Sequence, residues 1–97
     1  MIFDVELILD AKRRDAELGE ELLEAFLAAA PASDPVVDQD TGSGRTTVAF
    51  EVDASDMDAA AATAIEIVRA AVRGLGRETP MVGFHLDAAG DPELRAA

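Results

Sequence analysis

The stretch IFDVELILD, residues 2–10, alternates apolar and mostly acidic side chains with a period of two. Such alternation is typical of a β-strand with one buried face and one face in water. The inward positions are Phe3, Val5, Leu7 and Leu9. This stretch therefore predicts a sheet that is covered on one side and is open and acidic on the other.

Two later regions repeat the alternation and complete the sheet. Pro35 to Gln39 is a short predicted strand, and the turn-forming segment 40–44 joins it to a stronger strand, Arg45 to Asp53, as a hairpin. A last strand is predicted over Met81 to Asp87. Its inward side chains are Val82, Phe84 and Leu86.

Two segments with helical periodicity separate these strands. The first runs from Ala16 to Ala30, with Asp15 as its N-cap, and stops before a proline, which cannot continue a helix. The second opens at Ser55, which together with Asp58 resembles a capping box, and runs toward two glycines near residue 75. Its predicted inward face carries Met57, Ala61, Ala64, Ile65, Val68, Ala71, Val72 and Leu75.

The order strand, helix, strand, strand, helix, strand predicts an α+β fold of the ferredoxin-like βαββαβ type. Right-handed crossovers place both helices on one face of a four-stranded antiparallel sheet. The strands at 2–10 and 45–53 are then central, and the other two are edges. We expect a single domain over residues 1–88 and a short, poorly ordered tail over 89–97.

The composition excludes several classes of function. The 97 residues carry a formal net charge of −12 and no cysteine. Nucleic acids and anionic membranes bind concentrated Lys and Arg, so neither partner is expected. The absence of thiols excludes cysteine chemistry and suits a reducing cytoplasm. No apolar run reaches the roughly 20 residues of a membrane span, and we expect a cytoplasmic protein without a cofactor.

The first helix offers a candidate interaction surface. Its apolar stripe is wider than contact with one sheet requires, because Leu23 and Leu27 extend it, so these two leucines are expected to meet the second helix or another chain. The outer face carries a ridge of Glu17, Glu20, Glu21 and Glu24. The ridge is either a docking surface for a basic partner or simply the solvated face of the helix.

These features predict a non-catalytic protein that acts through protein contacts, either as a homodimer or by docking to a partner. The strand at 81–87 is the more suitable edge for pairing with a second copy, because the other edge contains Pro35. A catalytic centre is not expected, because no nucleophile motif and no phosphate-binding loop is present. An enzyme whose site is assembled across a dimer stays an open alternative.

The rival interpretation is a regulatory domain that senses a small ligand or a metal. His85 and Asp87 share one strand face, and strand pairing would bring Asp4 or Glu6 beside them, which suits acid–base work or a divalent ion. An exposed histidine among acids, with no ligand, is the alternative, and no metal site is predicted.

A second candidate ligand site lies in the loop after the first strand. Lys12, Arg13 and Arg14 are consecutive basic residues before a helix start, where an anion can bind. The alternative is a solvated loop in which the three residues offset neighbouring acids.

Four segments together resemble a known group of proteins. They are the alternating first strand, DPVVD at 34–38, GRTTVAFEV at 44–52, and the alanine-rich helix that leads to VRAAV at 68–72. The chain is similar over most of its length to uncharacterised small ferredoxin-like α+β proteins of GC-rich actinobacteria. The resemblance implies the fold, and it implies no activity and no functional residues.

Overall fold

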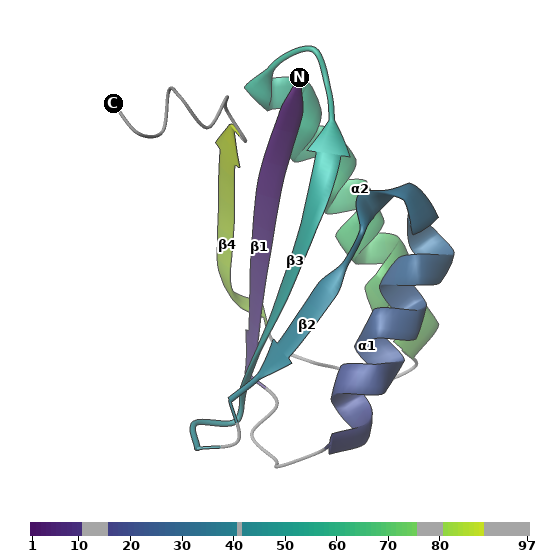
Figure 1. Ribbon diagram of the computed structural model, residues 1–97, viewed down its shortest axis with the longest axis vertical. Coiled ribbons are helices and arrows are strands. Elements are labelled where there is room, and N and C mark those ends of the chain that lie inside the picture. Colours follow the sequence, from purple (N-terminus) through teal and green to yellow (C-terminus); the bar gives the residue numbers. More distant parts are fainter. Residues whose placement is uncertain (11–15, 41, 76–80, 89–97) are drawn as a thin grey trace.

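The protein folds as predicted into one four-stranded sheet and two long helices (Figure 1). The structure is a computed structural model that describes residues 1–10, 16–40, 42–75 and 81–88. The elements, in chain order, are β1 (Ile2–Asp10), α1 (Ala16–Ala29), a short 3₁₀ helix η1 (Pro31–Ser33), β2 (Val36–Gln39), β3 (Arg45–Asp53), α2 (Met57–Leu75) and β4 (Met81–Ala88). The tail predicted at 89–97 lies outside the described residues.

The strand order is β2-β3-β1-β4, and every neighbouring pair is antiparallel. Strands β1 and β3 are therefore central, as predicted, and β2 and β4 are the edges. Both helices lie on the same side of the sheet (Figure 1). This arrangement is the ferredoxin-like α+β fold, and it leaves the other side of the sheet open.

The core lies between the sheet and the helices. All four inward residues of β1 are buried, because their alternation places them toward the helices. The buried Phe26 of α1 meets Phe50 of β3 with ring centroids 5.3 Å apart and ring planes tilted by 44°. This tilted geometry is favourable for an aromatic pair. The two rings therefore tie α1 to the centre of the sheet.

The buried face of α2 agrees with the predicted one at its centre and differs from it at its margins. Ala60, Ala64, Val68 and Ala71 are buried, and Ile67 packs against the core. Met57 and Ile65, which were expected to point inward, are exposed. The predicted burial of Ala64, Val68 and Ala71 is confirmed. The prediction was wrong for Met57 and Ile65 because alanine fits both buried and exposed positions, so the apolar pattern does not fix the margins of the buried face.

The N-cap of α2 also differs from the prediction. The carboxylate of Asp56, not the hydroxyl of Ser55, accepts a hydrogen bond from the N–H of Ala59 at 2.8 Å. The helix begins at Met57, so Asp56 occupies the capping position that Ser55 was expected to fill. Ser, Thr, Asn and Asp all cap well, and for that reason the sequence alone does not choose between these two neighbours.

We expect Asp56→Ala to lower the free energy of unfolding by about 1 kcal/mol, since it removes the cap. Ser55→Ala is the matched control and is expected to change stability by less than about 0.5 kcal/mol. Urea unfolding of the two variants measures both values. If Ser55→Ala lowered the free energy of unfolding as much as Asp56→Ala or more, Asp56 would not be the principal cap of α2.

Both edge strands depart from their predicted form at one end. Strand β2 starts at Val36, so Pro35 precedes the strand and is not part of it. In β4 the pairing with β1 shifts between Ile8 and Leu9, and Val82 falls out of register. The shift leaves Val82 52% exposed instead of facing the core, because a bulge inserts one unpaired residue into a strand.

The hairpin between β2 and β3 is confirmed. The N–H of Asp40 donates to the carbonyl of Arg45 at 2.8 Å, and the N–H of Gly44 donates to the carbonyl of Asp40 at 3.0 Å. Gly44 has a φ of 76°, which glycine adopts without steric penalty. The Asp40 carboxylate accepts the N–H of Gly42 at 2.9 Å. That hydrogen bond, followed by those from the hydroxyl and N–H of Ser43, lowers the pKa of Asp40.

A carbon-detected NMR titration is expected to give Asp40 a midpoint below the ordinary aspartate pKa of about 3.9. Because the pKa is lower in the folded state, the contribution of Asp40 to stability is complete above the ordinary value. It is lost as the pH falls through the folded-state pKa. The amide proton of Gly42 should follow the same titration, and Asp40→Asn should abolish that response. A midpoint at the ordinary value would contradict this account of the turn.

Candidate functional site

The open face of the sheet carries the candidate site. Strand register aligns its side chains in rows that cross the strands. One row contains only acids, and we call it the acidic row: Glu51 of β3, Asp4 of β1 and Asp87 of β4. The next row contains Val36, Ala49, Glu6 and His85. The third contains Asp38, Thr47, Ile8 and Gly83.

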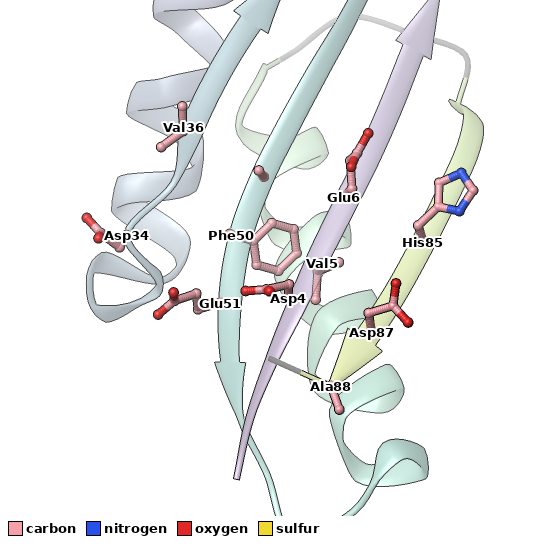
Figure 2. A pocket seen from close by; sticks show the side chains of 11 residues that line it. Asp4, Val5, Glu6, Asp34, Val36, Phe50, Glu51, His85, Asp87 and Ala88 are labelled. Atoms are coloured by element: carbon pink, nitrogen blue, oxygen red, sulfur yellow. The ribbon is translucent and has the colours of Figure 1, made fainter. Parts of the chain in front are cut away.

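The acidic row places like charges side by side. Asp4 is directly opposite Glu51 on one side and Asp87 on the other. Residues directly opposite each other on antiparallel strands have Cβ atoms about 4.5–5.5 Å apart, and like charges there are destabilising. Figure 2 shows the three carboxylates on the same side of the sheet. A bound cation would relieve this repulsion.

The neighbouring row supplies a group that can transfer a proton. His85 is exposed and lies directly opposite Glu6. Histidine is the side chain best suited to general acid–base work near neutral pH, and a neighbouring carboxylate can orient its ring. On the far side of Glu6, the apolar side chains of Ala49 and Val36 are exposed. The row therefore runs from an acid–base pair to an apolar surface.

The acidic row and the row of Glu6 and His85 border a shallow hollow of about 680 Å³ (Figure 2). A volume of this order suits a small organic molecule. The side chains of Asp34, Val36, Ala49, Glu51 and Ala88 line it together with those of Asp4, Glu6, His85 and Asp87, and the core residues Val5 and Phe50 complete it. The four residues that sequence analysis singled out as a possible ligand face are thus brought to one hollow. Their role in binding stays a prediction.

Two acids of the hollow were missing from the predicted site. Glu51 shares the outward phase of β3, but its place opposite Asp4 depends on the pairing of strands, which one strand does not encode. Asp34 follows η1 with a left-handed φ of 54°. It precedes Pro35, and residues before proline are usually extended, so no sequence signal indicated this conformation.

The same acids do not form a metal site. Among the described residues, no group of three or more His, Cys, Asp or Glu side chains is arranged to hold a metal ion. The metal part of the rival interpretation therefore has no preformed ligand set in this part of the chain. An organic molecule does not need several side chains arranged to coordinate one ion.

The predicted interaction residues of α1 do not join this site. Glu20, Glu21 and Glu24 are exposed on the helix, and Leu27 is 43% exposed. The side chain of Glu17 lies outside the described residues, as do Lys12, Arg13 and Arg14. The anion contact predicted for those three basic residues stays a prediction.

Leu23 lies toward β2, and its expected contact with the second helix or another chain stays a prediction. It lines a small surface hollow with Val37 and Gln39. The groove between the helices is lined mainly by small side chains, among them Ala25 and Ala70. An interface role for Leu27 stays a prediction.

Comparison with known proteins gives a likeness in fold. No family model and no curated protein matches the chain. A solved structure from Chloroflexus aurantiacus J-10-fl, provisionally named an antibiotic biosynthesis monooxygenase, superposes with a TM-score of 0.55 at 13% sequence identity. The match covers 94% of this chain and 96% of the other. At this identity the likeness establishes the fold over nearly the whole length.

This likeness corrects one expectation. The chain was expected to be non-catalytic and to act through protein contacts, but the solved structure that shares its fold carries the name of an enzyme. The expectation of a non-catalytic protein is therefore withdrawn, and the likeness itself shows the fold alone.

Neither α1 nor α2 combines the length and the apolar content that a membrane crossing needs.

Proposed function

We propose that the protein binds a small organic cation in the hollow on the open face of its sheet. The observation that carries the proposal is the acidic row, in which Asp4 lies between Glu51 and Asp87. Holding three like charges in register opposes folding. A positively charged ligand turns the same arrangement into a favourable one, because each carboxylate gains an opposite charge.

The hollow also suggests which part of the ligand lies where. A cationic group placed at the acidic row leaves the rest of the molecule above Ala49 and Val36, whose apolar side chains are exposed. Burying apolar area there contributes about 25 cal/mol per Å². The ligand class that fits is therefore an amine or quaternary ammonium compound with an apolar body.

Compounds that share a phenyl body and carry a cationic, a neutral or an anionic polar group test this proposal. We suggest thermal melting in the presence of 2-phenylethylamine, 2-phenylethanol and phenylacetate. A ligand that binds only the folded state raises the melting midpoint in a saturable way. The amine is expected to do so, and the alcohol and the carboxylate are not. Equal shifts from all three compounds, or none from the amine, would reject a cation site.

A catalytic role is the second candidate. It is supported by His85 opposite Glu6 at the edge of the hollow and by the enzyme name of the solved structure with the same fold. His85 would exchange a proton with a bound substrate while Glu6 orients its ring. Incubating a cell extract with the protein and following metabolites by mass spectrometry would detect turnover. His85→Gln should then abolish turnover, and the control variant Asp38→Asn should retain it. Loss of turnover in both variants would argue against a specific role for His85.

Two finer expectations belong to this proposal. A cytoplasmic location, which the absence of cysteine suits, remains a prediction. The resemblance to actinobacterial proteins also remains a prediction. Neither affects the assignment of the ligand class.

A further inference from the structure

The outer edge of β4 is a long strand edge that lies away from the helices (Figure 1). Strand β4 ends the sheet, and β1 is the strand that pairs with it. The opposite edge, β2, has only four residues and lies beside Gly19 and Leu23 of α1. An edge strand presents unpaired N–H and C=O groups that can accept another strand. Of the two edges in the described sheet, β4 is therefore the more open to pairing.

The side chains of β4 are only partly covered. Phe84 and Leu86 point to the helix side and pack against the core, and both are only partly buried. A strand added beside β4 would bury more of both side chains. Backbone hydrogen bonds and apolar contact would then act together at this edge.

The segment His85-Leu86-Asp87 is complementary to itself. When two copies of β4 run antiparallel about a two-fold axis at Leu86, His85 of each copy faces Asp87 of the second copy. Leu86 faces its own counterpart, and Phe84 faces Ala88. Opposite-charge and apolar pairs across antiparallel strands stabilise a sheet, and a two-fold axis repeats each contact. The charge pattern of β4 thus favours antiparallel pairing with β4 of a second copy of the protein.

We infer that two copies of the protein pair through β4, joining their sheets into one eight-stranded sheet. The open faces of the two copies then become continuous, and Asp87 of the second copy lies beside His85. The second copy would therefore contribute a carboxylate to the hollow. This inference concerns assembly and does not rest on the identity of the ligand.

A charge exchange tests the pairing. The oligomeric state of the full chain is measured by sedimentation and native mass spectrometry without ligand, at moderate ionic strength, because a net charge of −12 on each copy opposes association in low salt. His85→Asp alone and Asp87→His alone each place like side chains opposite each other twice. Each is expected to weaken the dimer about tenfold or more. The double variant exchanges the two residues and should restore the dimer.

Asp38→His is the matched control for Asp87→His, because it replaces an exposed aspartate by histidine on the other edge strand, β2. It should leave the dimer unchanged, and circular dichroism checks that every variant is folded. A wild-type protein that is monomeric at all concentrations would overturn the inference. So would a double variant that does not recover, or equal weakening by Asp38→His. Each of these results would leave the cation site standing, because that site is tested by ligand binding.

Discussion

Phe26→Ala is expected to lower the free energy of unfolding by about 3–5 kcal/mol. Phe26 is fully buried and meets the ring of Phe50, so truncation removes apolar burial, leaves a cavity and breaks an aromatic pair. A domain of this size has a total stability of about 5–15 kcal/mol. The substitution therefore removes a large share of what holds α1 to the sheet.

Leu27→Ala is the matched control for this prediction. Leu27 is the next residue along α1, it is 43% exposed, and its truncation should change stability by less than about 1 kcal/mol. Chemical unfolding followed by far-UV circular dichroism measures both variants. Comparable losses at the two positions would mean that α1 is rotated from the orientation described here.

Glu51→Gln combined with Asp87→Asn is expected to weaken binding of the organic cation by at least about tenfold, because hydrogen bonds to charged groups contribute about 1.5–3 kcal/mol each. The same double variant should be more stable than the wild type by about 0.5–1 kcal/mol. It removes both like-charge contacts of Asp4 while keeping the shapes of the side chains. Opposite effects on binding and stability are characteristic of a functional site.

Asp38→Asn serves as the control. Asp38 lies on the same open face but faces Thr47, not a carboxylate. It should alter neither stability nor affinity by a comparable amount. If the double variant were less stable than the wild type, the acidic row would stabilise the fold, whereas the account requires that it destabilise the fold. If affinity were unchanged, the ligand would bind elsewhere.

The sheet could be predicted from the sequence because its strands obey a strict period of two. In β1 each inward residue is large and apolar, and most outward residues are acidic, so only one phase is possible. The same reasoning placed Asp4, Glu6, His85 and Asp87 on the open face. Where a strand departs from regular pairing, as at Val82, the period breaks and the prediction was wrong.

The orientation of α2 could not be predicted in the same way. Alanine causes little penalty on either side of a helix, so Ile65 and Ile67 were equally plausible inward residues, and only packing against the sheet distinguishes them. The N-cap had the same ambiguity between Ser55 and Asp56. For the inward residue and for the N-cap alike, the sequence offers two suitable candidates, and tertiary contacts determine which one is used.

The candidate site was predicted only in part because it depends on pairing between strands. The outward phase identifies which residues reach the open face, but the register places Glu51 beside Asp4. The left-handed conformation of Asp34 depends on the path of the chain from η1 into β2. The expectation of a non-catalytic protein came from the absence of known sequence motifs. Such motifs are continuous in the sequence, so their absence gives no information about a site whose residues come from different strands and meet through strand pairing.

The most direct test of the cation site is to map the binding of 2-phenylethylamine by ¹H–¹⁵N NMR, with 2-phenylethanol as the neutral reference. The account predicts saturable shifts for the amine that are concentrated at Asp4, Glu51, Asp87 and His85, with little change at the helices. It predicts no saturable response at these residues for the alcohol. Equal responses to both compounds, or shifts confined to the groove between α1 and α2, would contradict a cation site on the open face of the sheet.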